Sequence, residues 1–569
     1  MIMLENGFNA FVNGPLQKLL QRATNKLRKS LSLGFVVTAL LQSSSLISVI
    51  TISFISAGLI GLHAGIGIIF GANLGTTATA WLVSVFGLKI KVSSLAMPIL
   101  AFGIVFTFQK SRSLKGIGNV LAGLGFFFLG IHFMKEGFDS YKQGLDLASY
   151  GWPGFWGLVV FTLLGIALTV ILQSSSATMA LILTALAAGQ ISYFNSLALA
   201  IGANVGTTIT AILSALGANI AGKRLAGAHF VFNLVTGLVA LIFITQIDYL
   251  VNLIAEKTDI AEDNYVLKLS VFHTLFNLLG VFIMVPFIDP LVRVLNRIFI
   301  EKPIVDGIDY PRYLNESTLA YPQAAFLALY NETRRLFDKV VYEAVAHSLN
   351  IHRQDIEGSE KLKKVVRRSR EEIEVDTDEL YYNRVKIIYS KIIKYATLIQ
   401  SNFSLTPKAN DAITHIKLAN RNMVEVIKYL GGLQVNVRKY IMPENPYIQK
   451  EYDRLRKKVS LILREIHLTR NDEDPESHIS RLEELKEKAR KSDVLVDGSL
   501  DELIRGNKIS SVMATSLAND SEIVAKITSN LVETAELLYI NIDSNMVLTE
   551  KEKAKRGPRK IKKKEKSKK

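Results

Sequence analysis

The chain reads LQSSSLISVITISFISAGLIGLHAGIGIIFGANLGTT from Leu41 to Thr77. No Asp, Glu, Lys or Arg occurs in this stretch, or anywhere from Ser30 to Leu88. A transmembrane helix needs about 20 apolar residues, so the charge-free block holds more than one span or a broken one. Two polar strings, QSSS near the start and GANLGTT at the end, favour a break within the membrane.

Both strings recur 131 residues later, as LQSSS from Leu172 to Ser176 and as GANVGTT from Gly202 to Thr208. The distance between the two strings is the same in each copy, so an internal duplication explains them and convergent apolar low complexity does not. A weaker match pairs LGIHFM at Leu129–Met134 with LGVFIM at Leu279–Met284.

We therefore predict an all-α polytopic membrane bundle with transmembrane repeats at residues 30–137 and 155–290. Hydrophobic segments are expected at about 31–60, 62–87, 92–108, 117–134, 155–189, 197–217, 225–247 and 268–288. The first and fifth segments are too long for one span. A tilted helix would absorb the excess, and so would a hairpin that enters the membrane and returns, which the polar strings favour. The chain contains no Cys, which excludes disulfide frameworks, thiolate metal sites and Cys nucleophiles.

The charge pattern predicts the orientation of the repeats. Residues 1–29 form an amphipathic segment with five cations and are expected in the cytoplasm. The loop at 135–154 has mixed charge and is expected outside, which would make the two repeats inverted, as in secondary transporters that use alternating access. An acidic loop from Asp248 to Asp263 is also expected outside, which leaves the C-terminal part inside.

The QSSS strings are the candidate binding residues. Hydroxyl and carbonyl oxygens suit Na⁺, whereas hydroxyl and amide hydrogens and helix N-termini suit an oxyanion. Serine also serves as a small residue for helix packing, but three serines beside a glutamine, found twice, favour binding. The candidates are Gln42, Ser43, Ser44, Ser45, Gln173, Ser174, Ser175 and Ser176.

The GANxGTT strings supply candidate supporting residues, whose neutral oxygens and donors could complete a site. These are Asn73, Thr76, Thr77, Asn204, Thr207 and Thr208, while the glycines are expected to allow close helix packing. An anion bound without Arg needs compensating charge from co-bound cations, which favours coupling to Na⁺. Two HxxxN pairs, His229 with Asn233 and His273 with Asn277, favour interhelical hydrogen bonds over proton sensing.

The paired QSSS and GANxGTT strings resemble those of the bacterial sodium-dependent phosphate cotransporters, a family related to the type II sodium/phosphate cotransporters, over about residues 30–290. The resemblance implies that inorganic phosphate is the substrate, that sodium is the coupling ion, and that the two QSSS hairpins form one shared site. By match, the eight QSSS residues would bind substrate and sodium, and the six Asn and Thr residues would support them. The resemblance does not divide these residues between the two ions.

Residues 305–548 show helical periodicity and are expected to form a cytoplasmic bundle. Pro311–Asp338 is similar to the opening of PhoU-like domains, which implies phosphate sensing and acidic metal clusters. For Glu371–Glu379 we favour a solvated helix face over a metal site. The tail at 549–569 is strongly basic and is expected to be disordered or to contact anionic lipid, and no nucleic-acid partner is expected.

We therefore expect a multi-pass cell-membrane symporter that takes up inorganic phosphate, driven by the sodium gradient. Its expected partners are phosphate, sodium and the lipid bilayer, with no further cofactor and no transition metal, and an oligomer is compatible with the sequence. A sodium symporter of another oxyanion and a membrane phosphate sensor with little flux remain alternatives. An enzyme is not expected, because neither part offers a nucleophile with a base or a Gly-rich phosphate loop.

Overall fold

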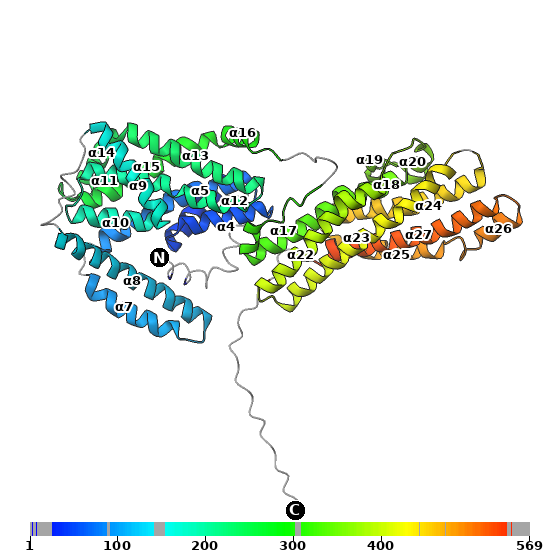
Figure 1. Cartoon of the computed structure of the whole chain (residues 1–569), viewed down its shortest axis with the longest axis horizontal. Helices are drawn as coiled ribbons and strands as arrows, with labels where there is room; N and C mark the ends of the chain where they lie inside the picture. Colours follow the sequence, from blue (N-terminus) through cyan, green and yellow to red (C-terminus); the bar gives the residue numbers. More distant parts are fainter. Residues whose placement is uncertain are drawn as a thin grey trace, which may run out of the picture. The chain divides into compact units, whose positions relative to one another are not determined.

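A computed structural model describes residues 3, 7, 26–87, 92–141, 154–301, 309–442, 444–472, 474–542 and 548. The structure is helical, and the described residues contain no strand, which confirms the predicted all-α class. Two compact units are present (Figure 1). The membrane unit comprises Met1–Glu301, Asn315–Ala324 and Glu550–Lys569, and the C-terminal unit comprises Lys302–Leu314 and Ala325–Thr549. Most of the predicted N-terminal segment, much of the loop at 135–154 and the basic tail lie outside the described residues.

The two predicted repeats form the same succession of helices. The first contains α3 (Leu27–Leu41), α4 (Ser44–Ser56), α5 (Leu62–Gly75), α6 (Thr77–Trp81) and η1 (Leu82–Gly87). The second contains α9 (Gly154–Leu172), α10 (Ser175–Ala187), α11 (Tyr193–Gly206) and α12 (Thr208–Leu216). Each long predicted segment is therefore broken at its QSSS string, and each GANxGTT string also contains a helix junction.

Glycines bring the helices of each repeat into close contact. A Cβ added to Gly71 of α5 would lie 2.0 Å from the backbone oxygen of Leu31, and one added to Gly202 of α11 would lie 1.9 Å from that of Thr162. Neither position can hold a side chain while α3 packs along α5 and α9 along α11. The predicted packing role of these glycines is confirmed.

The remaining helices complete the membrane unit. They are α7 (Val92–Thr107), α8 (Arg112–Tyr141), α13 (Ile220–Ile242), α14 (Ile244–Lys257), α15 (Tyr265–Met284), η3 (Val285–Phe287) and α16 (Ile288–Ile298). Glycine contacts show that α7 and α8 form an antiparallel pair (Figure 1). Six stretches of the described residues are long and apolar enough to cross a membrane: Leu62–Val85, Leu114–Ser140, Gly154–Leu172, Tyr193–Leu216, Ile220–Ile242 and Tyr265–Ile298.

The expectation of an acidic loop after residue 247 is largely wrong, because α14 occupies most of it. Ile247, Val251 and Ala255 are buried at spacings of four along this helix, whereas its charged residues Glu256 and Lys257 are exposed. The apolar spacing therefore determines the helix, and the acidic residues lie on its outer face and beyond its end.

A short segment that follows the membrane helices in sequence also belongs to the membrane unit. This segment, η4 (Glu316–Ala320), contacts both repeats. The Ser53 hydroxyl of α4 donates to the Ser317 carbonyl at 2.9 Å, and the Ser317 amide donates to the carbonyl of Gly217, which follows α12, at 3.2 Å. The Tyr321 ring packs edge-on against the Phe54 ring.

The C-terminal unit is a bundle of long and short helices with an apolar core. Its elements are α17 (Pro322–Leu336), η5 (Phe337–Val341), α18 (Tyr342–Ser348), α19 (Arg353–Glu357), α20 (Leu362–Arg368), α21 (Thr377–Leu380), η6 (Tyr381–Val385), α22 (Lys386–Asn402), α23 (Pro407–Tyr440), α24 (Pro446–Asn471), η7 (Pro475–His478), α25 (Ile479–Lys491), α26 (Ser499–Arg505), α27 (Ser511–Ala535) and η8 (Glu536–Ile540).

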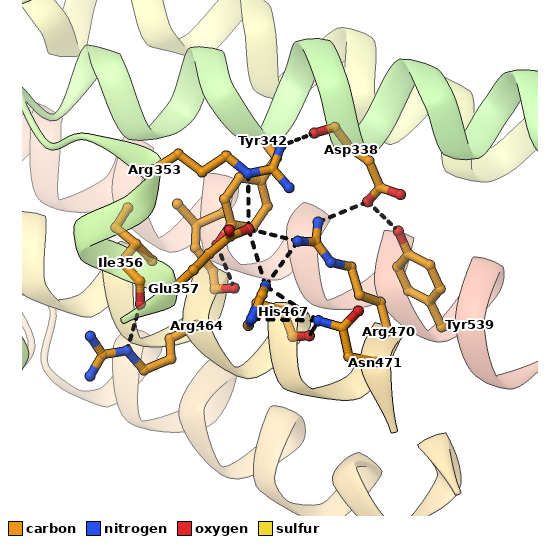
Figure 2. Close-up of polar contacts among 11 residues, drawn as sticks. Asp338, Tyr342, Arg353, Ile356, Glu357, Arg464, His467, Arg470, Asn471 and Tyr539 are labelled. Carbon is orange, nitrogen blue, oxygen red and sulfur yellow. Dashed lines mark hydrogen bonds and ion pairs between the residues drawn. The ribbon is translucent and has the colours of Figure 1, made fainter. Parts of the chain in front are cut away.

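An ion-pair network joins elements of this bundle that are distant in sequence (Figure 2). Arg470 of α24 donates to Asp338 of η5 at 3.2 Å and to Glu357 of α19 at 2.6 Å. Tyr539 of η8 donates to the same Asp338 oxygen at 2.7 Å, and Arg353 pairs with Glu357 at 2.9 Å. The network uses its donors on acids and carbonyls of the bundle itself, which indicates a structural role.

The acidic run at Glu371–Glu379 is solvent-exposed as expected, but its placement on one helix is wrong. Residues 371–376 are not helical, and Asp376 caps the N-terminus of α21 instead. Glu374, Asp376 and Glu379 line a cavity of about 270 Å³ together with Lys339 and Arg384. Cations between these acids leave no group of three metal-ligating side chains among the described residues.

Candidate functional site

The two glutamines end the first helix of each broken pair. Gln42 has φ 56° and Gln173 has φ 52°, the left-handed conformation that terminates a helix and that few non-glycine residues adopt. The following serines then begin the next helix: Ser43 accepts from the Leu46 amide at 3.3 Å, and Ser174 accepts from the Ala177 amide at 3.2 Å. The QSSS string is therefore a C-terminal stop followed by an N-cap.

The two strings meet through a threonine that the sequence analysis missed. Thr79 of α6 donates to Gln42 Oε1 at 2.7 Å, and its hydroxyl oxygen lies 3.1 Å from the Ser176 hydroxyl of the second repeat. Ser176 also lies 3.3 Å from the Gln42 carbonyl oxygen. Repeat-one and repeat-two residues thus form one continuous hydrogen-bonded group.

The same contact occurs with the repeats exchanged. Thr210 lies 131 residues after Thr79, and Ser45 lies 131 residues before Ser176. The Thr210 and Ser45 hydroxyl oxygens are 3.3 Å apart. The signal that could have revealed both threonines is a longer repeat, GANxGTTxT, in place of GANxGTT. We define these four hydroxyl residues, with Gln42, as the cross-repeat contact.

The predicted QSSS residues differ in exposure. Ser43, Ser44 and Ser176 are buried, Gln42, Ser45, Ser174 and Ser175 are half-buried, and Gln173 is exposed. Gln42 is held on both sides, because its Nε2 also donates to the Ala39 carbonyl at 2.5 Å. Gln173, its repeat counterpart, has no printed partner among the described side chains, so the two strings are equivalent in backbone and unequal in environment.

The GANxGTT threonines have a different local role from the QSSS serines. Thr76, Thr77, Thr207 and Thr208 are buried, and each hydroxyl donates to the carbonyl three residues earlier at 2.6–2.8 Å. Their hydrogens are thus used at the junctions between α5 and α6 and between α11 and α12. The described contacts do not join these four hydroxyls to a QSSS side chain, so the structure brings them near the junctions rather than into the cross-repeat contact.

The two asparagines of these strings are buried and differ in partner. Asn204 donates to Asn277 Oδ1 of α15 at 2.8 Å, which confirms an interhelical hydrogen bond for one HxxxN pair. Asn73 donates to the Ile69 carbonyl of its own helix at 3.2 Å, and its Oδ1 has no donor in the described structure. Asn233 likewise donates within its own helix, to the His229 carbonyl.

The cross-repeat contact contains no ionisable side chain. Its available groups are hydroxyl and amide oxygens, the hydroxyl hydrogens, and the N-termini of α4 and α10, which begin at Ser44 and Ser175. A helix N-terminus attracts an anion, and neutral oxygens coordinate a hard cation. The arrangement can therefore accommodate both signs of ion without a fixed charge.

Comparisons with known proteins agree with this chemistry. A sequence profile of the family described as Na⁺/Pi-cotransporter matches residues 1–136 and 159–258. The proteins named "Putative inorganic phosphate export protein YjbB" from Escherichia coli (strain K12) and Salmonella typhimurium are 29% and 28% identical, and each alignment covers 67% of this chain and 66% of the relative. "Uncharacterized protein YqeW" of Bacillus subtilis (strain 168) is 28% identical over 53% of this chain and 94% of that protein.

The chain thus spans just under two thirds of the length of the first of these relatives. No solved structure matches it.

Proposed function

Because the membrane unit of this chain belongs to the Na⁺/Pi-cotransporter family, we propose that the protein carries inorganic phosphate across the cell membrane together with sodium ions. The family is one of transporters and not of enzymes. The observation that carries the proposal is the cross-repeat contact, in which Thr79 and Ser176 lie 3.1 Å apart in a group free of fixed charge. In this proposal the eight QSSS residues bind the ions, and the GANxGTT asparagines and threonines hold the helix junctions beside them.

A neutral site explains the coupling to sodium. Phosphate brings negative charge into a region where the site itself offers only dipoles, hydroxyl hydrogens and helix N-termini. Sodium ions that bind beside it supply the missing positive charge, and their departure weakens the hold on phosphate. A permanent Arg clamp would give strong bidentate binding in every state and would oppose release.

The exchange of repeats in the two hydroxyl contacts supports a mechanism with two equivalent arrangements. We propose that the repeats are inverted and that they move against each other around the QSSS strings, so that access alternates between the two sides. Thr79–Ser176 and Thr210–Ser45 would then strengthen and loosen in opposite senses. The unequal environments of Gln42 and Gln173 correspond to one of the two arrangements.

The direction of transport follows from the gradients rather than from the site. We propose uptake driven by an inward sodium gradient, with the C-terminal unit in the cytoplasm. Net export is the second candidate, and the printed name of the Escherichia coli and Salmonella relatives favours it. We also propose that the C-terminal unit is a PhoU-like domain that responds to phosphate.

Proteoliposomes test the function. Purified protein is reconstituted, and labelled phosphate is measured inside the vesicles under an inward sodium gradient, an outward one, and with K⁺ in place of Na⁺. Accumulation that follows the sodium gradient supports cotransport, and its ratio under the two gradients separates uptake from export. A sensor would bind phosphate without accumulating it, and another oxyanion substrate would appear as transport of arsenate, sulfate or a dicarboxylate without phosphate transport.

A further inference from the structure

Lys268 is a buried cation near the start of α15. Only 7% of its surface is exposed, although lysine is rarely buried without an acidic partner. No Asp or Glu of the described residues forms an ion pair with it, and its ammonium lies 5.7 Å from the Tyr265 ring centroid. A lysine that extends to lipid headgroups would be exposed, so this burial within protein needs another explanation.

The nearest mapped carboxylate is already engaged. Tyr193 packs against Tyr265 with ring centroids 5.1 Å apart, and its hydroxyl donates to Asp248 at 2.8 Å. Asn252 donates to the other Asp248 oxygen at 3.2 Å. Asp248 is thus satisfied by neutral donors, and the positive charge of Lys268 is left for a group from outside the protein.

A row of polar contacts leads from the cross-repeat contact to this lysine. Two residues after Thr79, the Trp81 indole donates to Thr274 of α15 at 3.0 Å. Further along, the Ser84 and Ser270 hydroxyl oxygens are 2.6 Å apart. Thr274 and Lys268 are six residues apart on one helix, which corresponds to about 9 Å along its axis. The row thus runs along α15 toward its N-terminal end, where Lys268 lies.

We propose that Lys268 binds the phosphate anion at the end of this row and supplies the fixed positive charge that the QSSS strings lack. The inference rests on the proposed phosphate transport and names a residue that selects and recruits its substrate. A single ammonium attracts an oxyanion as a point charge, without the bidentate geometry of a guanidinium. It can therefore raise the occupancy of the site and still release the anion toward Thr79 and Ser176.

The test measures phosphate transport in proteoliposomes for the wild type and three variants. Lys268→Gln removes the charge, Lys268→Arg keeps it, and Lys257→Gln is the matched control, because Lys257 is an exposed cation in the last turn of α14. We expect Lys268→Gln to raise KM for phosphate about tenfold or more, as for loss of a charge-assisted hydrogen bond, with the maximal rate within about twofold. Lys268→Arg should stay within about threefold of the wild type, and Lys257→Gln should be unchanged.

Added salt gives an independent readout. Raising the ionic strength should increase KM of the wild type more than that of Lys268→Gln, because screening weakens a partly shielded charge. An unchanged KM in Lys268→Gln, with active wild type, overturns the inference and leaves the proposed function intact. A wild type that neither transports nor binds labelled phosphate overturns both.

Folding is checked by insertion and by elution as a single species. If Lys268→Gln does not insert, Lys268→Met keeps the unbranched stem and takes its place. Failure of both neutral variants to fold, while Lys268→Arg folds and transports, would assign the charge to stability and overturn the recruiting role.

Discussion

Thr79 in the first repeat and Ser176 in the second place their hydroxyl oxygens 3.1 Å apart. Their counterparts, Thr210 and Ser45, repeat the contact at 3.3 Å with the repeats exchanged. The contact joins the two QSSS strings, which are far apart in the sequence, through threonines outside both strings. It predicts that transport depends on residues of both repeats at once.

Replacing Thr79 or Thr210 with valine should lower phosphate transport at least about tenfold while the protein still folds. Thr79→Val leaves the half-buried Gln42 Oε1 without its donor, and an unmade hydrogen bond of this kind costs about 1–3 kcal/mol. The matched control is Thr184→Val, because Thr184 is a buried membrane threonine whose hydroxyl donates only within its own helix. Equal activity of all three variants would reduce the contact to packing.

Gln42 can be tested for its backbone and its side chain separately. Gln42→Gly accommodates the left-handed φ of 56° without strain but removes the amide that meets Thr79. We expect it to fold with stability near the wild type and to lose transport. Gln42→Val, which cannot adopt this conformation readily, should also lower the melting temperature. Full transport by the glycine variant would show that only the turn matters.

Gly71→Ala and Gly202→Ala should destabilise the membrane unit, because each added Cβ would lie within about 2 Å of a backbone oxygen of the neighbouring helix. The effect belongs to the class of overpacked cores, which typically lose about 1–3 kcal/mol. Gly137→Ala on α8 is the control, since its Cβ would meet nothing within 4 Å. Thermal unfolding in detergent should show lower transitions for the first two variants and no loss for the third.

The C-terminal unit should lose stability as the pH rises from about 4.5 to 7. Burial and the neighbouring Glu483 carboxyl raise the pKa of Glu536 from 4.5 to about 7. In this window the folded state holds more protons than the unfolded state, so stability falls with increasing pH.

Glu536→Gln imitates the protonated carboxyl and should remove this dependence. The temperature at which the C-terminal unit of the full chain becomes protease-sensitive should be higher than in the wild type at pH 8 and similar at pH 4. The same difference at both pH values would contradict the titration of Glu536.

The sequence predicts the parts of this fold that rest on local chemistry and on repetition. The breaks at Gln42 and Gln173 follow from polar strings in apolar segments, and the close contacts at Gly71 and Gly202 follow from the recurring glycines. Thr79 and Thr210 were missed because a threonine in an apolar helix resembles a packing residue. Their partners lie in the other repeat, and only the tertiary structure brings them together.

Other misses have equally specific causes. The acidic residues after Asp248 suggested a loop, whereas the apolar spacing of Ile247, Val251 and Ala255 produces α14. The acidic run at Glu371–Glu379 suggested a helix face, whereas Asp376 caps α21 and the preceding residues are irregular. In both stretches charge was weighed above periodicity and capping.

The most direct test of the account is to count labelled sodium and labelled phosphate entering the same proteoliposomes. Coupled transport through the cross-repeat contact predicts that phosphate flux requires sodium, that sodium flux rises when phosphate is added, and that Thr79→Val lowers both in proportion. Phosphate flux that is unchanged when K⁺ replaces Na⁺, or sodium flux that is indifferent to phosphate, would contradict the account.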